Sequence, residues 1–474
     1  MSASAAPAKT AAAHTGPANA TPALEAHVTP ALEARVNPAL EARPNASLPL
    51  MLEEARAAYA AARPASATLH DTARQSLAGG NTRSVLFYTP FPTAMTHGRD
   101  CRLWDADGRE YIDFCGEYSA GLFGHSEPRI LAAIRAALEK GLNLTAVGQN
   151  EGRLAALIQA RFPAMQRLRF TNSGTEANIM ALTAARNASR RPGVLAFRGA
   201  YHGGVLVFSG GGEAVTLPLP FTLADYNDGP GAAALIRAKA DEIGAVIVEP
   251  IQGAGGCLPA EPAFLHALRA ATAETGAVLI LDEVMSSRHA PGGMQQRLGV
   301  VPDMVTLGKY MAGGMSFGAF GGRAEIMAQF DGHRPGTLPH GGTFNNNVLS
   351  MAAGVVALGE VFGPAEAEAL FTRGEALRAA LNRVLAGSGM QFTGVGSMLC
   401  PHFRPGPIRA GYAATPAEEQ LRELYFLDMM EAGLYLARRG MIALSLPIGD
   451  AECARLVEAT AAFRERRAAV LPGI

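Results

Sequence analysis

The sequence predicts an α/β fold, with a large, mostly parallel sheet and a second, smaller α+β domain. Between residues 150 and 362, short apolar runs alternate with helical stretches. Such alternation is typical of strands joined by crossover helices, which form parallel sheets. Polar residues directly follow several of the apolar runs. Because parallel sheets bind ligands at the carboxyl ends of their strands, we expect a functional site at that edge.

The elements of the large domain can be read from the apolar runs and the stretches between them. Two helices are expected, at Glu176 to Ser189 and at Pro262 to Thr275. Six buried strands are expected, at Leu168 to Phe170, Val194 to Phe197, Ala245 to Glu249, Ala277 to Asp282, Met304 to Leu307 and Phe317 to Gly321.

The smaller domain is predicted to combine an N-terminal segment, residues 50–149, with a C-terminal segment, residues 363–474. Alternating apolar residues around Asp107-Gly108 favour a hairpin within Arg102 to Phe114. Other expected helices and strands are Leu50 to Arg63, Val348 to Phe362, Pro364 to Leu385, Gln391 to Val395, Pro416 to Arg438, Met441 to Ser445 and Asp450 to Arg467.

Residues 1–49 are rich in Ala, Pro and Thr and contain an eight-residue repeat. The repeat begins at Thr21, Thr29 and Asn37, and each start is followed by Pro-Ala-Leu-Glu-Ala. The proline in every repeat prevents a continuous helix, and one leucine per repeat buries little surface. We interpret the segment as a disordered tail. A targeting peptide is the alternative, which the missing run of large apolar residues and the glutamate in each repeat disfavour.

The composition is that of a globular protein, with 49% hydrophobic and 18% charged residues. Lys and Arg number 41 and Asp and Glu 42, so the formal net charge is -1. This balance gives no reason to expect a nucleic acid or an anionic membrane as a partner. No apolar run has the length of a membrane span. The five cysteines lack metal-ligand spacing, so we expect buried free thiols in a reducing, cytoplasmic compartment.

Two segments offer groups that suit a phosphate. Ser173, Gly174 and Thr175 follow a predicted strand and open a helix, where free N–H groups and the helix dipole attract anions. Thr343 lies in a second such segment, Gly341 to Asn347, which also precedes a helix. An ordinary helix N-cap is the alternative for both segments.

Three larger side chains follow other predicted strands. Tyr201 can stack on a flat heterocycle, although a packed loop aromatic would look the same in sequence. Asp282 ends a strongly apolar strand, and a protonated pyridine nitrogen would give this buried carboxylate a partner. The alternative for Asp282 is a loop cap or an arginine partner. Lys309 stands among small and apolar residues, which suit an amine that is used chemically better than a permanent ammonium. The alternative is a lysine that reaches the surface.

With these motifs in this order, the chain resembles the class III aminotransferases of PLP fold type I, which include ω-transaminases and glutamate-1-semialdehyde aminomutase. The resemblance runs from about Arg83 to the C-terminus. It implies pyridoxal 5'-phosphate (PLP) as cofactor, a homodimer with shared active sites, and Lys309 as the residue that would hold PLP as a Schiff base and move the proton. The other implied contacts are Ser173, Gly174, Thr175 and the partner subunit's Thr343 at the phosphate, Tyr201 and Val284 on the two ring faces, Asp282 at the ring nitrogen, and Glu249 near the cofactor.

Within this class the chain is most similar to the β-phenylalanine aminotransferases. The similar stretches are Arg83 to Tyr88, Gly313 to Phe320 and Gly342 to Asn347. The last reads Gly-Thr-Phe-Asn-Asn-Asn, where the aminomutase has Gly-Thr-Leu-Ser-Gly-Asn-Pro, which counts against aminomutase activity. The resemblance implies that Arg83 binds the substrate carboxylate and that Arg439 helps to bind a carboxylate in the other pocket. The context of Arg439 departs from the family, because Arg438 stands where a proline is expected.

The expected reaction moves an amino group from a β-amino acid, such as β-phenylalanine, to a keto acid such as 2-oxoglutarate or pyruvate. An aminomutase, racemase, decarboxylase or general ω-amine transaminase would use the same cofactor residues and stays open. A non-catalytic PLP-binding regulator is the alternative from another class. That alternative leaves Lys309 unexplained, and the sequence has no DNA-binding module or basic patch.

Overall fold

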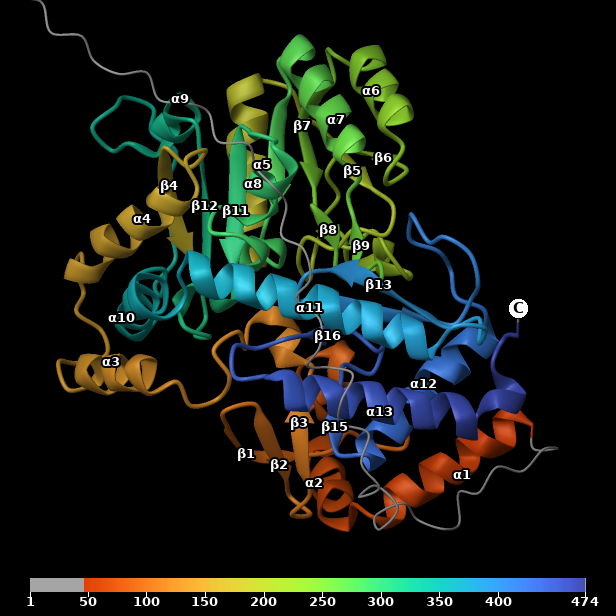
Figure 1. Ribbon diagram of the computed structural model, residues 1–474. Helices are drawn as coiled ribbons and strands as arrows, with labels where there is room; N and C mark the ends of the chain where they lie inside the picture. The colour runs from red at the N-terminus through yellow and green to blue at the C-terminus, as the bar shows by residue number, and fades with distance from the viewer. Residues whose placement is uncertain (1–46, 474) are drawn as a thin grey trace, which may run out of the picture. The chain divides into compact units, whose positions relative to one another are not determined.

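The computed structural model describes residues 47–473, so the repeats of the N-terminal tail lie outside the described residues. A seven-stranded sheet forms the centre of the large domain (Figure 1), and its strands follow the order β4-β12-β11-β10-β7-β5-β6. Their bounds are β4 Arg167–Thr171, β5 Gly193–Phe197, β6 Phe221–Ala224, β7 Ile243–Val248, β10 Val278–Asp282, β11 Met304–Gly308 and β12 Gly318–Gly322.

The sheet is mostly parallel, as the sequence predicts. β10 pairs in parallel with β7 and β11, and β5 pairs in parallel with β6 and β7. β12 is antiparallel to both of its neighbours, β11 and β4, so β4 runs in the same direction as the parallel strands. Every residue of β5, β7, β10, β11 and β12 is buried. Burial on both faces explains why these strands are continuous apolar runs.

Helices cover this sheet and connect its strands. α5 packs along β7, β10, β11 and β12, whereas α6 and α7 pack on each other and on β6 and β10. α10 packs on α3 and α4, away from α6 and α7 (Figure 1). The bounds are α3 Pro128–Leu138, α4 Gln149–Arg161, α5 Gly174–Ser189, α6 Gly229–Ala238, α7 Pro262–Thr275, α8 Gly293–Leu298, α9 Ala324–Met327 and α10 Val348–Val356, which a π-helical turn, Ala357–Val361, extends.

The N- and C-terminal segments of the chain meet in a second, smaller part. The predicted hairpin forms between β2 and β3, and β15 adds to β3 in parallel. One hydrophobic core therefore contains residues from both segments, such as Tyr59, Phe114 and Tyr425. The bounds are α1 Leu48–Ala61, α2 Pro64–Arg74, β1 Met95–Arg99, β2 Arg102–Asp105, β3 Glu110–Asp113, α11 Pro364–Val384, β13 Gln391–Val395, β14 Met398–His402, α12 Pro416–Glu431, β15 Leu434–Tyr435, β16 Ile442–Ala443 and α13 Asp450–Arg466. From the middle of the chain, β8 Ile251–Gln252 and β9 Leu258–Pro259 form a separate two-stranded sheet.

The structure corrects one predicted helix and adds helices and strands that were not predicted. The helix expected from Pro416 to Arg438 ends at Glu431, because Gly433 takes a left-handed conformation with φ 74° and the chain then enters β15. The strands β1, β6, β8, β9, β14 and β15 were not predicted. β6 is a four-residue edge strand and β14 contains a proline, so neither has a long apolar pattern. The predicted domain boundaries at residues 149 and 362 stay predictions.

Within the described residues, no single helix has both the length and the apolar character of a membrane span, and the bent pair Val348–Val361 with Pro364–Val384 meets those criteria only when its two pieces are counted together.

Candidate active site

The carboxyl edge of the central sheet brings together the residues that the sequence analysis singled out after separate strands. Because β4, β5, β7, β10 and β11 run in the same direction, the residues that follow them meet at one edge. These residues are Ser173 after β4, Tyr201 after β5, Glu249 after β7, Asp282 at the end of β10 and Lys309 after β11.

Asp282 is a buried carboxylate whose partners are neutral or titratable donors. Its side chain is 5% exposed. Asp282 Oδ2 accepts hydrogen bonds from Asn178 Nδ2 at 2.8 Å and pairs with His202 Nδ1 at 2.8 Å. Asp282 Oδ1 accepts from the Val284 amide at 3.0 Å. Neither an arginine nor a lysine neutralises this carboxylate among residues 47–473. The sequence alternative of an arginine partner for Asp282 is therefore wrong.

A buried polar network holds Asp282 in place. Asn178 Nδ2 also donates to the His202 carbonyl at 2.9 Å, and Thr306 Oγ1 donates to Asn178 Oδ1 at 2.6 Å. His202 Nε2 is buried without a partner in the described part of the chain. Asn178 and His202 are not among the residues predicted from the sequence. Asn178 interrupts the buried, alanine-rich face of α5, and a polar residue in such a stripe is a usable indication of a role.

Lys309 begins a short turn directly after β11 and takes a left-handed backbone conformation, with φ 58°. Such a conformation is uncommon in a non-glycine residue and clusters at functional sites. Burial, together with the positive charge of the nearby Arg439, lowers the pKa of Lys309 to about 8. The amine of Lys309 is therefore partly free base near neutral pH, as nucleophilic and proton-transferring lysines require.

The segment that begins α5 lies against the strand ends that carry Asp282 and Lys309. A Cβ on Gly174 would lie 2.9 Å from the Val284 side chain, and a Cβ on Gly308 would lie 3.5 Å from the Gly174 Cα. Only glycine allows this approach at position 174. Ser173 Oγ caps the helix by accepting the Glu176 amide at 3.2 Å. The remaining first-turn amides of α5 have no partner within the helix and suit an anion.

Two hydroxyl residues of the predicted phosphate site lie on different segments. Thr175 Oγ1 accepts the Gly204 amide at 3.2 Å, which joins the start of α5 to the loop after β5. Thr343 is exposed in the loop that precedes α10. That loop contacts the segment before α5 of its own chain, because Asn172 Nδ2 donates to Asn345 Oδ1 at 3.0 Å. A contact of Thr343 with the phosphate of a neighbouring subunit stays a prediction.

Glu249 positions the backbone that carries Tyr201. Its carboxylate accepts the Tyr201 amide at 2.9 Å and the Gly253 amide at 3.1 Å. Burial raises the pKa of Glu249 to about 7, although the nearby His202 opposes the shift. The Tyr201 side chain remains 43% exposed, which leaves its ring accessible to a ligand.

The two predicted carboxylate-binding arginines lie near Lys309 and have different partners. Arg83 Nη1 pairs with Glu117 Oε1 at 2.5 Å. The Arg439 guanidinium lies 5.5 Å from the centre of the Tyr118 ring and contacts Met441 Sδ at 3.2 Å. No carboxylate pairs with Arg439 among the described residues, and its Nε is buried without a partner. A cavity of about 290 Å³ is lined by Ser84, Val85, Phe87, Tyr88, Thr89, Tyr118, Arg438 and Arg439.

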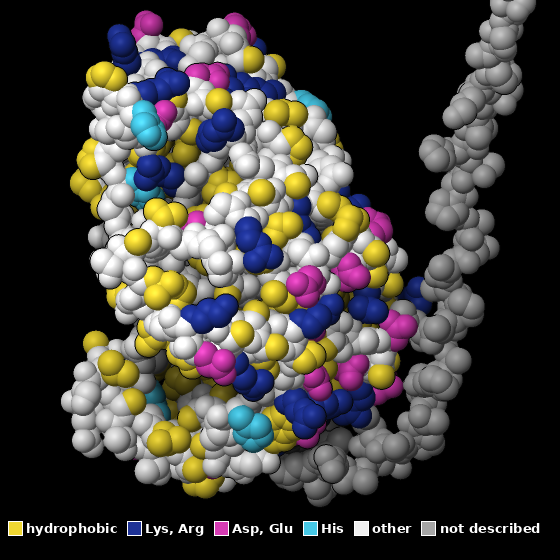
Figure 2. Space-filling view, turned by 90° about the vertical axis from the view of Figure 1, so that its left-hand side faces the viewer, with side chains coloured by type: hydrophobic (Ala, Val, Ile, Leu, Met, Phe, Trp, Pro, Cys, Tyr) yellow, Lys and Arg dark blue, Asp and Glu magenta, His cyan; other side chains and the backbone are white. Residues whose placement is uncertain are grey.

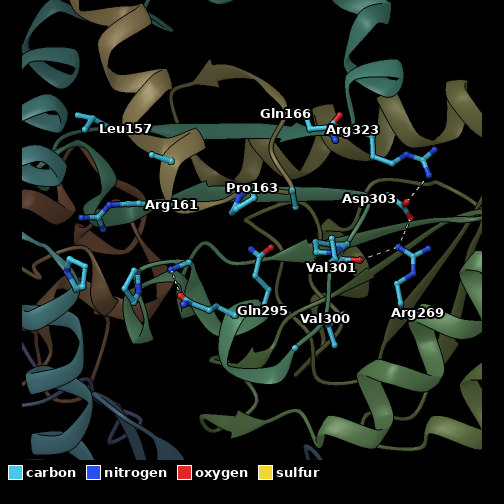
Figure 3. Close-up of a pocket in the computed structure, with 18 residues that line it drawn as sticks. Leu157, Arg161, Pro163, Gln166, Arg269, Gln295, Val300, Val301, Asp303 and Arg323 are labelled. Carbon is cyan, nitrogen blue, oxygen red and sulfur yellow. Dashed lines mark hydrogen bonds and ion pairs between the residues drawn. The ribbon is translucent and has the colours of Figure 1, made fainter. Parts of the chain in front are cut away.

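A second cavity, of about 1080 Å³, lies at the opposite edge of the sheet (Figure 3). Its lining includes Gln166 before β4, Asp303 before β11 and Arg323 after the antiparallel β12. Asp303 pairs there with Arg269 at 3.0 Å and with Arg323 at 2.9 Å. None of the predicted site residues lines this cavity. Its position at the amino ends of parallel strands is not where such sheets bind their ligands.

The carboxyl edge therefore fits a flat, phosphorylated and cationic heterocycle. The start of α5 offers amides to a phosphate, and Asp282 offers a buried carboxylate that lacks a strong base as partner. Lys309 offers an amine of lowered pKa on the neighbouring strand. Each group matches one chemical property of PLP.

Comparisons with known proteins point to the same chemistry. The family model described as aminotransferase class-III matches residues 87–459. The chain is 48% identical over 429 residues to the β-phenylalanine transaminase of Variovorax paradoxus, covering 90% of this chain and 99% of that protein. It is 35% identical to the glutamate-1-semialdehyde 2,1-aminomutase of Thermus thermophilus, covering 82% and 96% of the two chains.

Solved structures agree with these sequence matches. A crystal structure of a β-phenylalanine aminotransferase from Variovorax paradoxus superposes with a TM-score of 0.88 at 48% identity, covering 90% of this chain and all of that one. An ω-transaminase from Sphaerobacter thermophilus superposes with a TM-score of 0.80 at 38% identity, covering 85% and 98% of the two chains. Both the sequence similarity and the similarity of fold extend over nearly the whole length of the two relatives. The chain therefore belongs to the class III aminotransferases, enzymes of PLP fold type I that depend on pyridoxal 5'-phosphate.

Proposed function

We propose that this aminotransferase moves the amino group of a β-amino acid, such as β-phenylalanine, to a keto acid such as 2-oxoglutarate or pyruvate. The observation that carries the proposal is the pair of arginines near Lys309: Arg83, and Arg439 without a carboxylate partner among residues 47–473. Two carboxylate-binding groups suit a reaction in which an amino acid and a keto acid occupy the site in turn. The 48% identity to a β-phenylalanine transaminase supports the choice of a β-amino acid.

Arg83 is proposed to bind the donor carboxylate and Arg439 to help to bind a carboxylate in the second pocket. A guanidinium holds a carboxylate with two parallel hydrogen bonds, which fixes orientation as well as charge. In a β-amino acid the carboxylate lies one carbon further from the amine than in an α-amino acid. Val85 and Phe87, which follow Arg83 in the sequence, line a cavity together with Arg439 and provide an apolar wall for an aromatic side chain.

Lys309 is proposed to move the proton of the reaction. Bound PLP supplies an electron sink that stabilises negative charge on the carbon bearing the amino group. Lys309 Nζ, with its pKa lowered to about 8, accepts the proton from that carbon as a free amine and returns it later. Positioned proton transfer of this kind accelerates reactions by about 10²–10⁴-fold.

The remaining predicted residues are proposed to hold the cofactor. Asp282 would pair with the ring nitrogen and keep it protonated, because a nearby negative charge favours the charged form. Tyr201 and Val284 would cover the two ring faces, and Glu249 would fix the Tyr201 backbone. The phosphate would be held by Ser173, Gly174, Thr175 and the partner subunit's Thr343.

We further propose a homodimer, with active sites shared between subunits. Large apolar side chains are exposed near the Thr343 loop, namely Leu142, Leu144, Val147 and Phe344, and Val147 is 86% exposed. Asn346 Nδ2 donates to the Ala146 carbonyl at 3.2 Å, so these two exposed segments are neighbours. Figure 2 looks at the side of the molecule that carries α4 and α10 and shows hydrophobic side chains spread over it. Several large, exposed apolar side chains on neighbouring segments suit a protein–protein interface.

A cytoplasmic location completes the proposal. All five cysteines are free and buried, which suits a reducing compartment.

The visible absorption spectrum of the PLP-loaded protein, recorded before and after β-phenylalanine is added without an acceptor, tests the substrate. We expect the band of the bound cofactor to shift to the amine form, and the β-keto acid to appear in equal amount. A spectrum that β-phenylalanine leaves unchanged, but that a neutral amine or glutamate-1-semialdehyde alters, would replace the proposal by an ω-amine transaminase or an aminomutase. The 35% identity to aminomutases makes the second comparison necessary.

A further inference from the structure

Glu117 forms an ion pair with Arg83, whose guanidinium is the group that is proposed to bind the substrate carboxylate. Arg83 Nη1 lies 2.5 Å from Glu117 Oε1, and the two side chains are 44% and 56% exposed. The two residues are 34 positions apart, so the pair is a tertiary contact. In the free protein, Arg83 thus binds the carboxylate of Glu117, which is the same chemical group that an amino acid substrate presents.

Glu117 is held in this place by an unusual backbone. Gly116, Glu117, Tyr118 and Ser119 all have positive φ, with values of 51°, 47°, 53° and 80°. Three of these residues carry side chains, which rarely adopt such a conformation. The turn is fixed by the Cys115 and Gly116 amides, which donate to Asp113 Oδ1 at 2.9 and 3.0 Å. Strained backbone that the surroundings over-determine is characteristic of ligand sites.

The same turn connects the two arginines. The Tyr118 hydroxyl donates to the Val85 carbonyl at 3.0 Å, two residues after Arg83. The Tyr118 ring lies 5.5 Å from the Arg439 guanidinium. The charges of this pocket also act on Lys309, whose pKa Glu117 raises while Arg83 and Arg439 lower it. Glu117 is thus an acidic group placed among three basic groups of the candidate active site.

We propose that Glu117 occupies the place of the substrate carboxylate on Arg83 in the free enzyme and exchanges with that carboxylate when the amino acid binds. This inference rests on the proposed role of Arg83 in the proposed function. An exposed ion pair changes an equilibrium by no more than about five-fold, so a substrate carboxylate that binds with two hydrogen bonds displaces it. Glu117 is then a specificity-determining residue: substrates with a carboxylate must break the pair, whereas neutral amines need not.

The substitution Glu117→Gln tests the exchange, because it removes the competing charge and keeps the shape of the side chain. We expect the PLP-loaded variant to bind 3-phenylpropanoate, an unreactive carboxylate, about two- to five-fold more tightly than the parent protein in calorimetric titrations. We expect KM for β-phenylalanine to fall by a similar factor. KM for 1-phenylethylamine, which has no carboxylate, should not change.

A matched control is Glu110→Gln, which breaks another exposed pair of this chain. Glu110 pairs with Arg102 at 2.8 Å, and the two side chains are 46% and 41% exposed. This variant should leave the affinity for 3-phenylpropanoate unaltered. In an Arg83→Ala background, Glu117→Gln should also lose its effect, because the two residues act through one contact.

Three results would overturn the exchange: an unchanged affinity for 3-phenylpropanoate in Glu117→Gln, a weaker affinity, or an effect that persists in the Arg83→Ala background. The calorimetric readout does not require turnover. If Glu117→Gln tightens carboxylate binding but no variant consumes β-phenylalanine, the exchange stands and the proposed substrate fails.

Discussion

Asp282 and Asp303 are both buried, at opposite edges of the central sheet, and their surroundings differ. Asp303 lies at the amino edge, is 4% exposed, and pairs with Arg269 and Arg323 (Figure 3). It also accepts the Leu279 amide at 2.8 Å. Asp282 lies at the carboxyl edge, is 5% exposed, and contacts Asn178, His202 and a backbone amide.

The charges at the amino edge are paired within the fold, whereas the charges at the carboxyl edge lack partners that a ligand can supply. At the amino edge, the cluster neutralises its own carboxylate with two guanidinium groups. At the carboxyl edge, neither Lys309 nor Arg439 has a carboxylate partner within residues 47–473, and Asp282 has no lysine or arginine. Unpaired and desolvated charges in one place are typical of functional sites, because a bound ligand supplies the missing partners. The following predictions test whether the two edges differ in this way.

Lys309→Ala is expected to have the largest effect. Without the amine that moves the proton, kcat for amino transfer should fall by at least about 10²-fold, and up to about 10⁴-fold. Binding of PLP through its phosphate should persist, which ultrafiltration with absorbance detection can measure. Lys239→Ala, which removes an exposed lysine paired with Glu242, is the control and should keep full activity. Full turnover in Lys309→Ala would contradict the assignment.

Asp282→Asn is expected to lower kcat by about 10²–10³-fold, because the amide cannot stabilise charge on the cofactor ring. The melting temperature of the protein without cofactor should change little, since the amide oxygen still accepts from Asn178. Parallel measurements of kcat and melting temperature separate the two effects. A large loss of stability with normal kcat would make Asp282 a structural residue like Asp303.

Arg83→Ala is expected to raise KM for β-phenylalanine by about 10–100-fold. This factor corresponds to the binding free energy of a hydrogen-bonded pair of charged groups. KM for 1-phenylethylamine should stay within about two-fold of the parent value, because that amine carries no carboxylate. Steady-state kinetics with both substrates decides the point. An equal rise for the two substrates would show that Arg83 only supports the structure.

Asp303→Asn is the counterpart at the amino edge. It should lower the free energy of unfolding by about 1–3 kcal/mol, because Arg269 and Arg323 lose their shared carboxylate. The partial exposure of both arginines keeps the loss moderate. Denaturant titration measures the loss, and kcat of the folded variant should match the parent. A kcat deficit without a loss of stability would contradict the contrast between the two edges.

A further expected effect concerns pH. The pKa of Glu249 rises from its usual 4.5 to about 7 in the folded protein, mainly because of burial. The folded state therefore binds more protons than the unfolded state between these two values, and stability falls as pH rises through this window. Glu249→Gln should flatten this slope in melting temperatures recorded from pH 4.5 to 7.5. If Glu249→Gln leaves the dependence of melting temperature on pH unchanged, other groups cause that dependence.

The central sheet was predictable because its strands are buried on both faces and hence continuous in sequence. The run at Val278–Asp282 is apolar up to its last residue, the run at Met304–Gly308 contains one polar residue, Thr306, and the structure places both strands side by side. The edge strand Phe221–Ala224 escaped prediction because it is short and only partly buried. The helix from Pro416 was predicted too long because periodicity continues beyond Gly433, where the backbone turns.

For the candidate site, the order of residues along the chain is enough to show which chemical groups follow the strands. A parallel sheet places the same end of every strand at one edge, so Ser173, Asp282 and Lys309 had to meet once the strands were recognised. The tertiary structure alone decided the partners: Asn178 and His202 for Asp282, and Glu117 for Arg83. These contacts join residues 104, 80 and 34 positions apart. Local periodicity carries no information about such distant contacts, because they depend on how whole elements pack against one another.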